Sequence, residues 1–196
     1  MLAGGYLGAV GVFAAVRGPA GLPRPQALAA TPAALAAGKL WLLVTSAFVV
    51  SGPPPLELAA VAAAVATLVR REGAGAFWRV APISHFGSTL IAYAGVGALW
   101  LADQGAVARI VHDPDFGISA VWMGVLGALL GGSVGSAMRT PVRCREQDLR
   151  EHLLVAVCLI AAVIGLVFFP PLPGAEHTLA FALGAAVSLR PWRRPA

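Results

Sequence analysis

A serine and a histidine stand at the start of two different apolar segments of this chain. Ser119 belongs to the run Gly117-Ile118-Ser119-Ala120, which opens a glycine-rich apolar segment, and His177 opens the last apolar segment. A serine hydroxyl becomes a good nucleophile only when a neighbouring base takes its proton, and histidine is the usual base. The two residues therefore predict a Ser-His pair for acyl transfer, provided that the fold brings them together.

Each residue near the serine has an expected role in such a pair. Ser119 would attack a peptide carbonyl, while His177 acts as general base and then as acid toward the leaving amine. Gly117 and Ile118, at the start of a helix, are expected to support the oxyanion. We expect Asp115 to cap that helix, with orientation of His177 as the alternative. The alternative for the pair itself is a serine that only packs and a histidine that only faces water.

The composition indicates a membrane protein. Of the 196 residues, 58% are hydrophobic and 12% are charged, and the mean hydropathy is +0.79. A soluble domain carries about twice that charged fraction. Apolar runs close to the roughly 18 residues that cross a bilayer recur along the chain. Six spans are predicted, at residues 2–16, 56–69, 80–101, 117–138, 153–169 and 177–189. The expected fold class is all-α, a single domain over residues 1–196 that forms a six-transmembrane-helix bundle.

Basic residues between the predicted spans indicate the orientation. With the N-terminus inside, ten of the 14 lysines and arginines lie in inner segments and four lie in outer ones. The excess predicts that both termini are cytoplasmic. High Ala, Gly, Pro and Arg usage points to a bacterial source, and hence to the inner membrane. Ser119 and His177 then share the extracytoplasmic end of their helices, as a reacting pair must.

Small residues predict which helices are neighbours. Gly127 and Gly131 in the fourth segment, and Ala180 and Gly184 in the sixth, have the small-xxx-small spacing that lets helix backbones approach closely. We therefore expect the fourth and sixth helices to pack together. Such a contact would bring a short serine side chain within reach of an imidazole.

Two further features need an interpretation. Residues 40–50 are apolar but too short to span a bilayer, so we interpret them as a re-entrant or interfacial piece, with a seventh span as the alternative. His85 is expected near the cytoplasmic end of the third helix, away from Ser119. We expect it to make a structural hydrogen bond among Ser84, Ser88 and Thr89.

Other chemistries have no support in the sequence. No cluster of His, Cys and acidic residues has metal-ligand spacing, so no metal site is predicted. No phosphate-binding glycine loop is present, and the net charge of +5 is explained by topology signals rather than by nucleic acid. We expect no cofactor.

The order of these motifs resembles the rhomboid family of intramembrane serine proteases. The fourth segment is similar to the fourth rhomboid helix, which carries G-x-S-G and further glycines, here Gly117, Ser119, Gly124 and Gly127. The sixth segment is similar to the sixth helix, in which small residues follow the catalytic histidine. Within the superfamily, the chain looks closest to divergent bacterial rhomboid-like proteins. That group also has an aspartate two residues before the G-x-S glycine, and H-x-x-x-T in the third helix, like His85 and Thr89.

The resemblance implies a six-helix fold with a water-filled site open to the outside. It also implies cleavage of single-pass membrane proteins near that face, with membrane lipids as the other partners. Two departures count against activity. Ala120 replaces the last motif glycine, and the second segment lacks the family's H-x-x-x-N, whose side chains help to bind the oxyanion. Losing one such donor typically lowers the rate about 10² to 10³-fold.

Two other functions stay open at this point. The first is a catalytically silent rhomboid-like protein that binds transmembrane helices. The second is a small transporter, which predicts a mid-membrane solute site and an internal repeat of segments. The sequence shows no such repeat.

Overall fold

The computed structural model describes residues 2–16, 25–50, 54–139 and 171–189, with a few single positions between 153 and 164. This described part is all-α, and its one extended pairing is an isolated antiparallel bridge between Ala30 and Asp115. A 3-10 turn covers Ile110–His112. The helices are α1 (Leu2–Val16), α2 (Pro25–Leu28), α3 (Pro32–Ala36), α4 (Trp41–Ser46), α5 (Pro54–Glu72), α6 (Ala74–Ala102), α7 (Gln104–Val107), α8 (Ile118–Arg139) and α10 (Pro171–Leu189).

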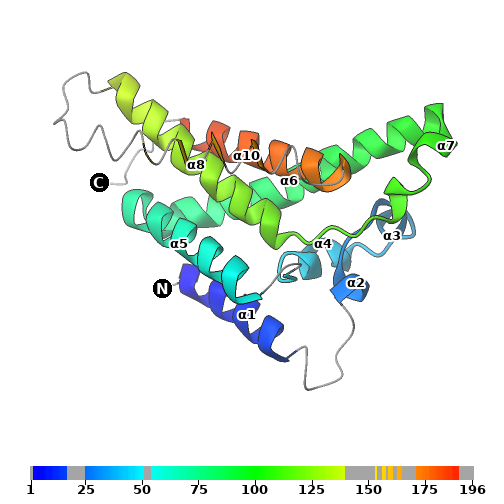
Figure 1. The fold of residues 1–196 in the computed structure, drawn as a ribbon, viewed down its shortest axis with the longest axis horizontal. Coiled ribbons are helices and arrows are strands. Elements are labelled where there is room, and N and C mark those ends of the chain that lie inside the picture. Colours follow the sequence, from blue (N-terminus) through cyan, green and yellow to red (C-terminus); the bar gives the residue numbers. More distant parts are fainter. Residues whose placement is uncertain are drawn as a thin grey trace.

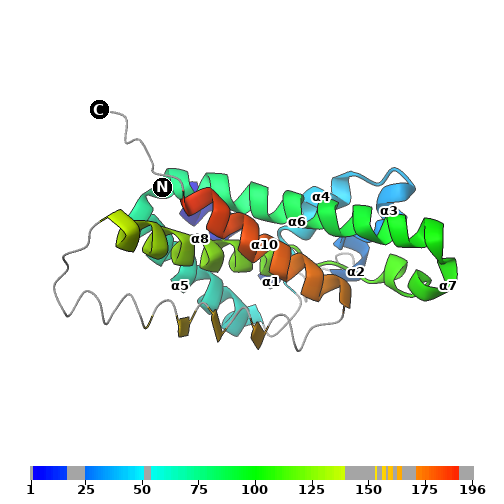
Figure 2. The same cartoon turned by 90° about the horizontal axis from the view of Figure 1, so that it is seen from above.

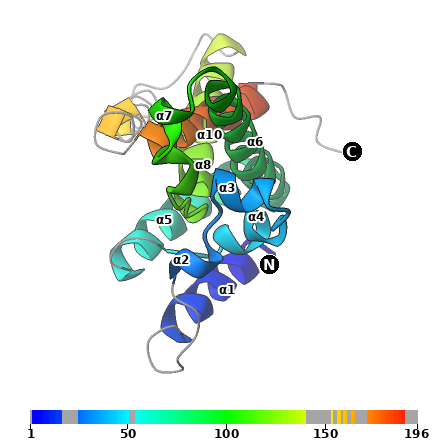
Figure 3. The ribbon, with the colours of Figure 1, turned by 90° about the vertical axis from the view of Figure 1, so that its right-hand side faces the viewer.

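Helices α6, α8 and α10 form the centre of the fold. Each of the three packs against the other two, and α5 lies against both α6 and α8 (Figure 1). Figure 2 shows that α6 extends beyond α8 and α10 toward α7. Figure 3 shows the short helices α3 and α4 between α1 and the α6 end of the molecule. The main apolar core joins side chains of α1, α5, α6 and α8.

Two described helices are long and apolar enough to cross a membrane, namely Ala74–Ala102 and Ile118–Ser136. They agree with the spans predicted at residues 80–101 and 117–138. The apolar stretch in α1, Ala3–Ala15, is shorter, and neither α5 nor α10 meets the same criterion. The span predicted at residues 153–169 lies almost entirely outside the described residues. An all-α fold with two candidate spans is therefore shown, and a six-span bundle is not.

Helix α6 begins six residues earlier than predicted. Gly73, with φ of +86°, separates α5 from α6, a conformation that glycine adopts without strain. Arg79 therefore lies inside the helix, where its exposed side chain donates to the Gly75 carbonyl oxygen at 3.1 Å. The longer helix moves His85 to its twelfth residue, about 18 Å along the axis.

Residues 40–50 do not form a seventh span. Helix α4 has only six residues, which extend for about 9 Å. The surrounding segment is tied to its neighbours instead. The Tyr6 hydroxyl donates to the Ala47 carbonyl oxygen at 2.7 Å, and the Thr45 hydroxyl donates to the Leu28 carbonyl oxygen at 3.0 Å. Of the two interpretations, the structure therefore excludes the span.

Candidate active site

Backbone contacts hold α8 against α10, as the spacing of small residues predicts. A Cβ atom on Gly127 would overlap the Phe181 carbonyl oxygen, and one on Gly131 would overlap the Ala185 carbonyl oxygen. Gly184 meets α8 in the same way from the other side. Since higher residue numbers on α8 pair with higher numbers on α10, the helices run in the same direction. Their N-terminal ends therefore meet.

Ser119 and His177 meet at this shared end. The His177 Nε2 atom lies 2.8 Å from the Ser119 Oγ atom. His177 is 3% exposed, and Ser119 is half-buried. The serine hydroxyl has a second acceptor, the Phe116 carbonyl oxygen at 2.9 Å. Because the hydroxyl has a single proton, it can be given either to the carbonyl or to the imidazole. The geometry is that of a nucleophile beside its base.

His85 lies beside this site, so the prediction that it sits apart from Ser119 is wrong. A Cβ atom on Gly117, two residues before the serine, would overlap the His85 ring. The His85 Nε2 atom is 2.7 Å from the Leu43 carbonyl oxygen and 3.4 Å from the Ser46 hydroxyl. The error follows from the earlier start of α6, which places His85 in the middle of a long helix.

The hydrogen bonds of His85 also differ from the prediction. The Ser88 hydroxyl donates to the His85 backbone carbonyl oxygen at 3.2 Å, and the described hydrogen bonds of the imidazole go to Leu43 and Ser46 in α4. Because Nε2 faces a carbonyl oxygen, it carries the proton in the neutral ring. The other ring nitrogen, Nδ1, is buried and has no hydrogen-bond partner in the described structure.

Two backbone N–H groups near the Ser119 hydroxyl already donate to carbonyl oxygens of the protein. The Gly117 N–H donates to the Ser46 carbonyl oxygen at 3.0 Å, so it is not free to receive an oxyanion. The Ser119 N–H donates to the Phe116 carbonyl oxygen at 3.2 Å. Ile118 is fully buried in the apolar core. The contribution of Gly117 to the site is therefore its close packing against the His85 ring.

Asp115 lies three residues before α8 and does not cap it. Its carboxylate accepts from the Thr89 hydroxyl at 3.3 Å, and its backbone N–H donates to the Ala30 carbonyl oxygen at 2.8 Å. The carboxyl group faces Glu176, not His177. Burial raises the pKa of the Asp115 carboxyl above its ordinary value.

The sequence interpretation missed Glu176. This side chain is 0% exposed and sits directly before the histidine of the pair. The sequence did contain a sign of it, because an acidic residue at the edge of an apolar segment often has a functional role. Placing the start of the segment at His177 left Glu176 in a loop, whereas α10 begins at Pro171.

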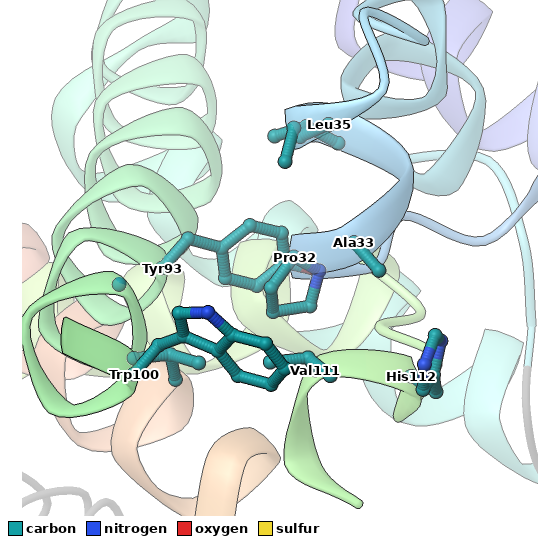
Figure 4. A pocket seen from close by; sticks show the side chains of 10 residues that line it. Pro32, Ala33, Leu35, Tyr93, Trp100, Val111 and His112 are labelled. Atoms are coloured by element: carbon teal, nitrogen blue, oxygen red, sulfur yellow. The ribbon is translucent and has the colours of Figure 1, made fainter. Parts of the chain in front are cut away.

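An apolar pocket of about 600 Å³ opens between α3, α6 and the Ile110–His112 turn. Figure 4 shows Tyr93 and Trp100 on its α6 side and Pro32 on its α3 side. Tyr93 lines this pocket and also lies near both Asp115 and Glu176. The described residues contain no group of three or more His, Cys, Asp or Glu side chains that could hold a metal ion.

Substituting Gly117 with alanine tests the contact with His85. The added methyl group would overlap the ring, which its bond to Leu43 holds in place, so we expect a loss of about 1–3 kcal/mol in unfolding free energy. The measurement is the thermal unfolding midpoint. The control is Gly97→Ala, on an open part of α6 with no atom within 4 Å of the new methyl group. The double variant Gly117→Ala/His85→Ala should lose less than the sum of the single changes. Additive losses would contradict the contact.

Comparison with known proteins identifies no relative whose function can be transferred. The functional interpretation therefore rests on the residues and contacts described above. No protein-family model, curated protein or solved structure matches this chain.

Proposed function

We propose that this chain is an intramembrane serine protease of the rhomboid type, with Ser119 as nucleophile and His177 as general base. The observation that carries the proposal is the 2.8 Å separation of Ser119 Oγ and His177 Nε2. These atoms come from residues 58 positions apart that stand at the same end of two parallel helices. A serine that only packs in a helix needs no such partner.

The reaction follows from this geometry. His177 accepts the hydroxyl proton as Ser119 attacks the carbonyl carbon, and it then gives that proton to the leaving amine. Water, activated by the same histidine, releases the acyl group from the serine. The substrates are single-pass membrane proteins cut near the extracytoplasmic face of a bacterial inner membrane, with both termini of the enzyme in the cytoplasm. Lipids surround the bundle.

The place of His85 supports a rhomboid-type site. That family positions a histidine, from an H-x-x-x-N motif, close to the catalytic serine, and the second predicted span of this chain has none. Here His85 reaches Gly117 from α6, and Thr89 follows it at the same spacing. A histidine therefore stands beside the G-x-S run, although it comes from a different predicted span.

One observation favours the second candidate, a silent rhomboid-like protein that binds transmembrane helices. The N–H groups of Gly117 and Ser119 both donate to carbonyl oxygens of the protein. An oxyanion at Ser119 would need at least one of these bonds to open, or a donor from another residue. A protein that kept only the fold would have no need of such a donor.

The deciding experiment is labelling of the detergent-solubilised protein by a fluorophosphonate probe, which reacts with activated serines. We expect wild type to be labelled and Ser119→Ala to be unlabelled. Ser136→Ala, a partly buried serine farther along the same helix, is the matched control and should label like wild type. Folded wild-type protein that stays unlabelled would favour the silent binding protein.

A further inference from the structure

Two buried carboxyl groups face each other behind the candidate dyad. Asp115, in the loop before α8, is 3% exposed, and Glu176, on α10, is 0% exposed. The two groups lie within reach of a mutual hydrogen bond. No hydrogen-bond donor of the described structure reaches either Glu176 carboxyl oxygen. A buried carboxyl with no other partner is costly unless its neighbour satisfies it.

The surroundings of the two acids include hydroxyl groups and two histidines. On α6, the Thr89 hydroxyl donates to Asp115 Oδ2, and the buried Tyr93 hydroxyl, near both acids, has no partner in the described structure. His85, also on α6, lies close enough to Asp115 to act on its carboxyl group. His177 follows Glu176 on α10 and bonds to Ser119.

Two carboxylates in contact at this burial cannot both be ionised, because their repulsion is strong where solvent is largely excluded. A single proton between them removes the repulsion and creates a strong, charge-assisted O–H···O bond. We propose that Asp115 and Glu176 share one proton at neutral pH, and that this bond latches the loop leading into α8 to helix α10.

The latch also bears on the dyad, a consequence that rests on the proposed function. Asp115 is four residues before Ser119, and Glu176 is adjacent to His177. The shared proton therefore joins the two elements that carry the nucleophile and the base. On this view the two acids are positioning residues, since neither touches the reacting atoms.

The latch predicts a pH dependence with a defined sign. In the unfolded chain both carboxyls lose their protons near pH 4. The folded pair retains one proton above that pH, so the folded state binds more protons than the unfolded state. The stabilisation that the latch contributes is therefore complete at low pH and falls as pH rises. For one proton, the unfolding equilibrium constant changes by about tenfold per pH unit.

The burial of His177 adds a trend of opposite sign. A buried imidazole that is neutral in the folded state gains a proton on unfolding in acid, so it favours the folded state as pH rises toward about 7. This contribution is common to wild type and to variants of the acids. The difference between the proteins therefore isolates the latch.

The test is the thermal unfolding midpoint of the full chain in detergent from pH 5 to 9, with wild type compared with Glu176→Gln and Asp115→Asn. The amide preserves a hydrogen bond to the remaining carboxylate but cannot lose a proton in this range. We expect the advantage of wild type over each variant to shrink steadily as pH rises. Asp113→Asn, a partly exposed acid on the same loop, is the control and should follow the wild-type curve.

Three results would overturn the latch. The first is a wild-type midpoint that is constant or rises between pH 7 and 9, which decides the matter even if the variants do not fold. The second is a difference between wild type and variants that does not change with pH. The third is stabilisation by Na⁺ or Ca²⁺ that Glu176→Gln abolishes, because the site would then hold a cation in place of the proton.

These results are separable from the proposed function. The unfolding midpoint does not depend on catalysis, and fluorophosphonate labelling is measured on the same samples. The expected pH trend without labelling would remove the protease and keep the latch. Labelling without the pH trend would support the protease and remove the latch.

Discussion

Replacing His177 with glutamine is expected to slow fluorophosphonate labelling of Ser119 by at least about 10³-fold. Glutamine is close to histidine in size and can still hydrogen-bond to the serine hydroxyl, which lies 2.8 Å from Nε2 in the wild type. It cannot accept the proton, so the serine remains a weak nucleophile. The labelling rate constant and the unfolding midpoint of the same preparation are the two measurements.

The matched control is His112→Gln, which changes an exposed histidine at the end of the Ile110–His112 turn. We expect this variant to label at the wild-type rate. If His177→Gln also labelled at that rate while remaining folded, His177 would not be the base, and the contact with Ser119 would be structural.

The same role makes labelling depend on pH. Only the neutral imidazole can accept the serine proton, so the wild-type rate should fall as the solution is acidified through the pKa of His177. The rate is measured from about pH 8 down to about pH 3, because a buried imidazole takes up its proton at a lower pH than one in water. The unfolding midpoint is recorded at each pH to show that the protein remains folded. A flat profile would argue against general-base catalysis by this residue.

The dyad was predictable from sequence because its determinants are local. The order of apolar segments and the count of basic residues placed Ser119 and His177 at the same end of their helices. The spacing of Gly127 and Gly131 then indicated close packing, because only a small residue lets two backbones touch. The contacts of both glycines with α10 confirm that interpretation.

The surroundings of the dyad were harder to predict because they depend on helix ends and on long-range loop contacts. Arg79 and Glu176 were each taken as the edge of an apolar segment, although both lie inside helices. One error moved His85 away from Gly117, and the other concealed the partner of Asp115. The bridge between Ala30 and Asp115 joins irregular segments 85 positions apart, and no periodic pattern in the sequence predicts such a contact.

The crossing of α8 and α10, which brings Ser119 close to His177, is expected to be sensitive to added side-chain volume. We expect Gly184→Leu to lower the unfolding free energy by about 3 kcal/mol or more, a fall of about 6–12 °C in the unfolding midpoint for a chain of this size. A Cβ atom at Gly184 would overlap the Gly124 carbonyl oxygen and lie 2.9 Å from the Gly124 Cα atom. Both are backbone atoms, so no side-chain rotation can relieve the overlap, and the helices must separate.

Gly95→Leu is the control, since a Cβ atom at this exposed α6 position meets no atom within 4 Å. It makes the same chemical change inside a helix without affecting a crossing, and we expect its midpoint to stay near the wild-type value. Separation at Gly184 should also weaken labelling of Ser119, because His177 is two helical turns earlier on the same face. Equal midpoints for the two leucine variants would mean that α8 and α10 do not touch here. The fold would then give no reason for Ser119 and His177 to lie close together.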